Sequence, residues 1–247
     1  MSIIVDIMKR RSNYRFYTEQ IPDKNVVDTI LRQAHELTPH KNNVFRYRVN
    51  VFGPEFAEDK KKLALLTCTK REVMKRHRPL TDEYLAKVEK IYDEWFQIGA
   101  GPKIQGYAFL PQVTAPYLLA YTYDTLKQIN KEQERRFRKY SMLEYARNFS
   151  ETEWTIQASM HAFAVALLCA EQGLTASFCQ CYFFDDKLKN KILSSARDKQ
   201  TTLFYLGIGY GDDTKRQKGS VLIPKLEYEE VIKWKEKHYD YMDKKQN

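Results

Sequence analysis

The chain has 247 residues, 43% of them hydrophobic, and a formal net charge of +9 at pH 7. That is enough apolar material for a real core. No apolar run reaches the roughly 20 residues that a membrane helix needs. The first residues lack the basic region and cleavage site of a signal peptide. We therefore expect a cytoplasmic protein with no membrane partner. Since no repeat, linker or low-complexity tract interrupts the sequence, one domain over 1–247 is the simplest organisation.

The excess of positive charge favours an anionic partner, such as a phosphate, a nucleotide or a nucleic acid, without choosing between them. The cysteines and the five histidines show no metal-ligand or redox spacing. We expect reduced thiols and no metal site. The four cysteines are Cys68, Cys169, Cys179 and Cys181.

The first half of the chain predicts two helices, a strand and a helical region. A first amphipathic helix ends near Arg11. A second begins after Asp23, a typical N-cap residue, and turns one apolar face inward. That face comprises Val26, Val27, Ile30, Leu31 and Ala34. Alternating apolar residues over 45–51 predict a strand, and 55–100 reads mostly as helix.

The second half predicts a central strand and the most hydrophobic helix. Apolar residues on both faces of 115–121 indicate a buried strand. The charged segment 125–150 indicates a lid or a surface helix. Residues 154–171 predict a hydrophobic helix that Gly173 ends at its C′ position. The remaining predicted elements are strands near 176–179 and 203–208, a helix over 185–196 and a C-terminal helix over 228–242.

The end of the first helix carries the strongest functional signal. Arg10, Arg11 and Ser12 supply two guanidinium groups and a hydroxyl within three residues. Such a cluster can bind a phosphate from several directions. The same cations could instead simply complement the dipole at a helix C-terminus.

Three later segments join 10–16 in a pattern that resembles the nitroreductase family of FMN-dependent oxidoreductases. They are the loop-to-strand passage 39–47, the passage 173–182 after the hydrophobic helix, and the glycine-containing strand end 206–211 with the basic residues that follow it. Tyr14 stands where the family has its usual second basic residue. The order and spacing of the four segments carry the resemblance.

The resemblance implies an α+β fold, a nitroreductase-like three-layer sandwich with a central, mostly antiparallel sheet flanked by helices. It also implies a homodimer, with the C-terminal extension 225–247 wrapping a partner subunit. The implied FMN-binding residues are Arg10, Arg11, Ser12, Tyr14, Asn43, Gln180, Cys181, Arg216 and Lys218. The arginines, Ser12 and Lys218 would bind the phosphate, Asn43 the polar edge of the flavin, and the 180–181 backbone flavin N5.

The activity implied is hydride transfer from NADH or NADPH through flavin N5 to a nitroaromatic, a quinone or a similar small acceptor, by a ping-pong mechanism. The chemistry belongs to the flavin, so no catalytic side chain is assigned. Within 125–150, Arg135 and Arg136 would cover the cleft and influence acceptor choice.

Three alternatives stay open. One is a specialised member of the same fold, such as a flavin-consuming or reductively deiodinating enzyme. A second is a degenerate flavoprotein that keeps the fold as a scaffold. A third is a basic nucleic-acid-binding protein, because interleaved Arg, Lys, Tyr and Phe suit phosphate contacts and base stacking.

Overall fold

The structure is a computed structural model that describes residues 17–39, 45, 47–66, 81–97, 104–105, 107, 109–124, 131–139, 151–179, 200–212 and 228–232. The chain divides into two compact units, 1–217 and 218–247. Helix α10 (Tyr228–Val231) belongs to the second unit, and every other element below belongs to the first. The single-domain organisation stays a prediction.

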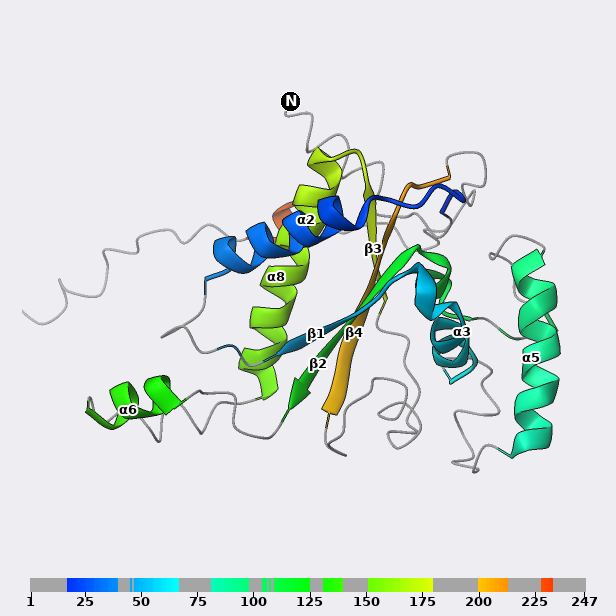
Figure 1. Cartoon of the computed structure of the whole chain (residues 1–247), viewed down its shortest axis with the longest axis horizontal. Coiled ribbons are helices and arrows are strands. Elements are labelled where there is room, and N and C mark those ends of the chain that lie inside the picture. The colour runs from blue at the N-terminus through cyan, green and yellow to red at the C-terminus, as the bar shows by residue number, and fades with distance from the viewer. Residues whose placement is uncertain are drawn as a thin grey trace, which may run out of the picture. The chain divides into compact units, whose positions relative to one another are not determined.

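Four antiparallel strands form a sheet in the order β1-β2-β4-β3 (Figure 1). The strands are β1 (Arg48–Phe52), β2 (Tyr117–Asp124), β3 (Thr175–Cys179) and β4 (Gln200–Gly209). Strand β2 lies inside the sheet between β1 and β4, so the central strand predicted over 115–121 is confirmed. The β2–β4 register shifts between Tyr121 and Thr122.

Helices cover both faces of the sheet and make three layers (Figure 1). One face carries α2 (Lys24–Leu37) and α8 (Glu151–Glu171). The other carries α3 (Ala57–Leu66), α5 (Asp82–Gln97) and the 3-10 helices η2 (Pro54–Phe56) and η3 (Pro111–Thr114). The predicted three-layer α+β sandwich with an antiparallel sheet is confirmed.

Strand β2 shows how one sheet supports two cores. Leu119 and Tyr121 point into the core on the α2/α8 face, while Leu118 and Ala120 point into the core on the α3/α5 face. All four side chains are fully buried. Side chains alternate along a strand, so an apolar residue at every position is what a strand covered on both faces requires.

Helix α2 begins as predicted, but it buries a narrower face. The Asp23 carboxylate accepts the Asn25 backbone N–H at 2.7 Å and caps the helix. The buried residues are Val27, Ile30 and Ala34, a single row on one side of the helix. The prediction that Val26 also faces inward is wrong, because Val26 lies off this row and is 36% exposed.

Helix α8 ends at Glu171, just before Gly173, as the sequence predicted. Gly173 has φ +73°, a left-handed conformation that favours glycine. Its N–H donates to Ala170 O at 3.2 Å, and the Leu174 N–H donates to Cys169 O at 2.7 Å. This pair of bonds is the Schellman motif, which satisfies the last carbonyls of a helix.

Other predicted elements are partly covered by the described residues. The strand over 45–51 appears as β1, with Phe52 buried and Val51 41% exposed. The charged segment 125–150 contains the surface helix α6 (Lys131–Lys139). The helix ending near Arg11, the helix over 185–196 and most of the 228–242 helix lie outside the described residues. Within the described part of the chain, no helix is both long and apolar enough to span a membrane.

Candidate functional site

All nine predicted FMN-binding residues lie outside the described residues. They are Arg10, Arg11, Ser12, Tyr14, Asn43, Gln180, Cys181, Arg216 and Lys218. The described residues that flank these segments do carry information, because they fix where each segment enters or leaves the sheet.

Tyr17, immediately after the first segment, meets the flanks of two other segments. It pairs with Gly211 in an isolated antiparallel bridge, and the Thr18 N–H donates to Tyr210 O at 2.8 Å. The Tyr17 hydroxyl donates to Gly207 O at 3.0 Å and shares a short hydrogen bond with Ser177 Oγ. Tyr17, which directly follows segment 10–16, therefore contacts described residues of segments 173–182 and 206–211.

Two glycines of β4 make room for this tyrosine. A Cβ on Gly207 would lie 2.7 Å from the Tyr17 hydroxyl, and a Cβ on Gly209 would lie 2.8 Å from Tyr17 Cδ1. Both contacts are too close for a side chain. The sequence predicts a strand near 203–208, which includes Gly207, and a glycine-containing strand end over 206–211. Both glycines lie within β4, where glycine permits the close approach of another segment. We call Tyr17, Ser177, Gly207 and Gly209 the Tyr17 junction.

Buried polar atoms surround the junction. Gln112 of η3 donates from Nε2 to Phe178 O at 3.1 Å. Its Oε1 and the Thr175 hydroxyl are buried without a hydrogen-bond partner among the residues that the structure describes. The Gln112 carbonyl oxygen lies 3.1 Å from the position of a Gly207 Cβ. The junction is thus packed by polar as well as apolar atoms.

Lys60 supports the same region from α3. Its ammonium donates to Ala115 O and Pro116 O at 2.9 Å each, and the side chain is buried. Burial lowers the pKa of Lys60 to about 8, and the charge of Glu55 opposes that shift in part. Pro116 is the residue whose Cδ would lie 2.6 Å from a Cβ on Gly209. Lys60 therefore holds the backbone corner against which the junction packs.

Two described residues of segment 39–47, Phe45 and Tyr47, lie on the α2/α8 face. Phe45 stacks on His35 with ring centroids 4.5 Å apart, and the Tyr47 ring lies 5.4 Å from the His161 ring. Tyr121 and His161 share a 2.9 Å hydrogen bond in the core. Burial raises the pKa of both Tyr47 and Tyr121, which keeps the two phenols neutral.

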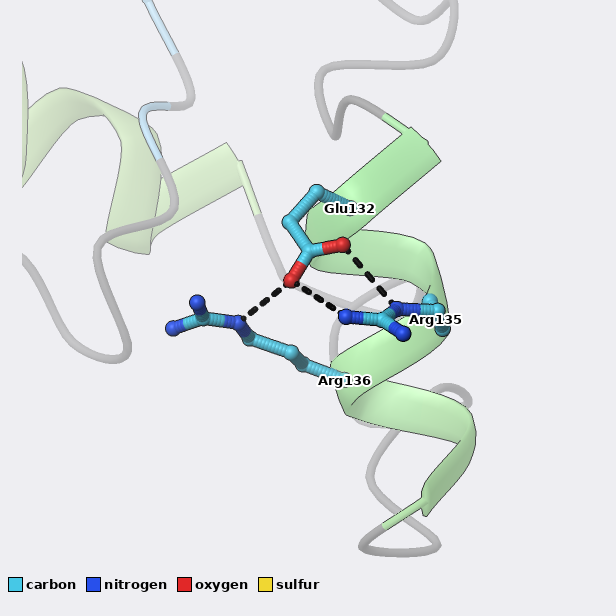
Figure 2. A network of polar contacts seen from close by, with 3 residues as sticks. All are labelled: Glu132, Arg135 and Arg136. Carbon is cyan, nitrogen blue, oxygen red and sulfur yellow. Dashed lines mark hydrogen bonds and ion pairs between the residues drawn. The ribbon is translucent and has the colours of Figure 1, made fainter.

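Helix α6 carries the arginine pair that the sequence assigned to acceptor choice. Figure 2 shows both guanidinium groups directed at one carboxylate, that of Glu132. Arg135 reaches it at 2.9 and 3.0 Å, and Arg136 at 2.9 Å. These hydrogen bonds hold the pKa of Glu132 down at about 2. An anion that approached either arginine would have to compete with this carboxylate.

Helix α8 is apolar on the side that faces away from the core. Ile156, Met160 and Phe163 follow the i, i+4, i+7 spacing of one helical row and are 53%, 41% and 54% exposed. The inward row holds smaller or polar residues such as Ala158, His161 and Ala162. A helix that is hydrophobic all round is normally covered on both sides.

No candidate metal site is found among the described residues, which bring no three His, Cys, Asp or Glu side chains together in a suitable group.

A binding site for FMN would need Arg10 to Ser12, Asn43 and Arg216, which lie outside the described residues. The alternate spacing of Gly207 and Gly209 is a sequence signal for a close contact at the end of β4, although it does not identify Tyr17 as the partner.

Comparisons with known proteins give a fold but no close relative. No protein-family model matches the chain, and no curated protein sequence matches it significantly. Solved structures do match. The FMN and NADPH-dependent nitroreductase NfnB from sphigopyxis sp. strain HMH is 18% identical with a TM-score of 0.59, over 96% of this chain and 100% of that chain.

Two further structures extend the comparison. A protein from Exiguobacterium sibiricum 255-15 solved in complex with FMN is 16% identical, with a TM-score of 0.60 over 95% of this chain and 98% of that chain. CLA-ER, an enone reductase of gut-bacterial fatty acid saturation, is 14% identical, with a TM-score of 0.54 over 84% and 88% of the two chains. The chain has the nitroreductase fold, and the predicted resemblance is confirmed at the level of the fold.

Proposed function

We propose that this chain is an FMN-dependent oxidoreductase that takes hydride from NADH or NADPH and passes it to a small acceptor such as a nitroaromatic or a quinone. The observation that carries the proposal is the Tyr17 junction within the nitroreductase fold. It joins Tyr17, next to segment 10–16, to described residues of segments 173–182 and 206–211, which the family resemblance links to FMN.

The residues named for the cofactor suit FMN in their chemistry. Arg10, Arg11, Ser12 and Arg216 offer the cations and hydroxyl that a phosphate accepts. An amide such as that of Asn43 can donate to or accept from the polar edge of a flavin. When bound, FMN supplies two-electron chemistry at its N5 atom, and the protein's part is to bind and orient it.

The described residues supply a neutral, rigid support for such a site. Burial raises the pKa of Tyr17, so its phenol stays protonated and keeps its two hydrogen bonds. No described side chain is needed as a nucleophile or a general base. We therefore assign the described residues to binding and orientation.

We also propose that the protein is a homodimer and that it acts in the cytoplasm. The exposed row Ile156, Met160 and Phe163 on α8 supports the dimer, because an apolar helix face of this kind is stabilised when a second surface covers it.

The acceptor is proposed only as a class. NfnB is described as a nitroreductase and CLA-ER as an enone reductase. Nitro groups and enones are both electron-poor π systems that accept hydride equivalents. A small electron-poor acceptor is thus the substrate class that this fold supports for the chain.

Purification tests the proposal directly. The protein should be yellow, show flavin absorbance and release FMN when denatured. It should then oxidise NADH or NADPH in the presence of a quinone or a nitroaromatic. The double variant Arg10→Ala with Ser12→Ala should lose FMN.

Two other outcomes have distinct meanings. A colourless protein that cannot be loaded with FMN, and that binds oligonucleotides with a steep salt dependence, would overturn the proposal in favour of nucleic-acid binding. A protein that holds FMN but oxidises neither NADH nor NADPH would be a flavoprotein scaffold.

A further inference from the structure

We infer that Tyr17 is a positioning residue for the FMN phosphate, which it serves by fixing the first predicted phosphate-binding segment to β3 and to the end of β4. The inference rests on the proposed function and goes beyond it, because Tyr17 itself belongs to none of the motif positions that suggested FMN.

The contacts of Tyr17 are long-range in sequence and short in space. Ser177 and Gly207 are 160 and 190 positions away in the chain. Arg10 to Ser12 precede Tyr17 by only a few residues, and Arg216 follows Gly211 by a few. A chain spans at most about 3.5 Å per residue, so fixing Tyr17 and Gly211 sets an upper bound on how far each of these cations can lie from the junction.

The hydrogen bonds of the Tyr17 hydroxyl have a defined direction. A phenol has one proton, and Tyr17 donates it to Gly207 O at 3.0 Å. The Ser177 hydroxyl must therefore be the donor in the second bond. Tyr17→Phe would keep the ring over Gly207 and Gly209 and remove both hydrogen bonds.

The surroundings of the ring leave little room for another arrangement. Cβ atoms on Gly207 or Gly209 would collide with Tyr17, and Gly209 is also packed against Pro116. Lys60 ties Ala115 and Pro116 to α3 through two hydrogen bonds. The position of Tyr17 is thus set by the core on the α3/α5 face, which gives it the rigidity that a positioning residue needs.

Tyr117 offers a matched control. Its hydroxyl also donates to a backbone carbonyl of the N-terminal region, that of Pro22 at 3.2 Å. It lies in the core on the α2/α8 face, away from the Tyr17 junction. Tyr117→Phe therefore removes a comparable bond without touching the segment ends that Tyr17 joins.

The test titrates apoprotein with FMN and follows the quenching of flavin fluorescence. We expect Tyr17→Phe to raise the FMN dissociation constant about tenfold, Ser177→Ala about threefold, and Tyr117→Phe not measurably. The melting temperatures of the apoproteins should fall by similar amounts in Tyr17→Phe and Tyr117→Phe. A purely structural role for Tyr17 would give the two tyrosine variants the same FMN affinity.

Amide hydrogen exchange gives a second readout that needs no flavin. The Thr18 N–H bonds Tyr210 O next to Tyr17, whereas the Thr38 N–H bonds Ala34 O at the end of α2. Tyr17→Phe should speed exchange at Thr18 at least fivefold relative to Thr38.

The outcomes separate the two proposals. Wild-type protein that takes up no FMN overturns both. If wild-type protein and the Tyr17→Phe variant bind FMN equally tightly, the proposed function stands and the positioning role is overturned. Unchanged exchange at Thr18 in Tyr17→Phe would likewise show that Tyr17 does not hold this segment.

Discussion

The two helical layers differ in the side chains that they expose on their outer surfaces. On the α3/α5 side, Lys61 joins the helices by ion pairs to Glu89 at 3.0 Å and Asp93 at 2.9 Å. On the α2/α8 side, the outer row of α8 is apolar, with Ile156, Met160 and Phe163 all exposed. The α3/α5 layer thus exposes ion pairs as well as single apolar residues such as Phe96, whereas α8 exposes a continuous apolar row.

The inner surfaces differ in the same sense. The α3/α5 core packs large aromatic rings, such as Tyr92, Trp95 and Phe109, whose centroids lie 5.2 to 5.5 Å apart. Helix α8 instead places alanines and the Tyr121–His161 hydrogen bond against the sheet. Alanines are frequent among the α8 residues that face the sheet, whereas Ile156, Met160 and Phe163 point outward. This asymmetry is consistent with the proposed dimer, in which a second copy of the chain would cover the outer row of α8.

The largest expected effects test whether the sheet needs both layers equally. Leu118 and Leu119 are fully buried neighbours on β2 that point into opposite cores. Leu118→Ala and Leu119→Ala should each lower the free energy of unfolding by about 3 to 5 kcal/mol, because each removes buried methyl groups and leaves a cavity. Denaturant unfolding measures both, with the exposed Val51→Ala as the mild control. A loss below 1 kcal/mol for one of them would mean that its layer is dispensable to the fold.

The second prediction concerns the outer surfaces directly. Phe163 on α8 and Phe96 on α5 are equally exposed, at 54% and 53%. Phe163→Glu should weaken self-association about 100-fold, because it buries a charge in the proposed dimer contact. Phe96→Glu should leave association unchanged. Sedimentation across a concentration series measures both variants.

Two results would contradict the proposed role of the outer α8 row. If the two variants dissociate alike, the apolar row on α8 has no special role. If wild-type protein is a monomer at all concentrations, the proposed dimer is wrong.

Local signals predicted much of the fold. The fully apolar run of β2 predicted a strand covered on both faces, and Asp23 and Gly173 marked the start of one helix and the end of another. Each is a short-range effect of side-chain alternation, capping or backbone conformation. Such effects depend only on residues that lie close together in the sequence.

The orientation of α8 and the Tyr17 junction could not be read in the same way. An all-round apolar helix has no polar side to indicate which row faces the sheet, so Phe163 looked as suitable for the core as Ala162. Tyr17 binds residues far along the chain, and no local pattern encodes such a pairing. The candidate site was therefore predicted only as segments, through the family resemblance, and its nine residues stay predictions.

The third prediction concerns pH and the α3/α5 side. Burial lowers the pKa of Lys60 from 10.5 to about 8 in the folded protein. Between these values the unfolded state binds the proton more strongly, so the free energy of unfolding should rise as pH increases from 8 towards 10. We expect a gain of about 1 to 2 kcal/mol relative to Lys60→Met, allowing for solvent screening.

The neutral amine of Lys60 still has two N–H groups for the carbonyls of Ala115 and Pro116, so its deprotonation need not disturb the Tyr17 junction. Urea unfolding of both proteins at pH 7 and pH 10 measures the difference, since other titrating groups cancel in the comparison. A Lys60 contribution that falls with pH would show that its charge is stabilised rather than penalised on this side of the sheet.

The smallest expected effect concerns the turn that connects α8 to β3. Gly173 has φ +73°, and a Cβ there would meet no atom within 4 Å, so any cost of substitution comes from the backbone alone. Gly173→Ala should lower the free energy of unfolding by about 1 kcal/mol, and Gly173→Asn by about half of that, because asparagine tolerates the left-handed region. Thermal or urea unfolding resolves the two. If alanine and asparagine cost the same, the Schellman turn is not what stops α8, and the direction in which its apolar row points would have to be set by packing against β3 instead.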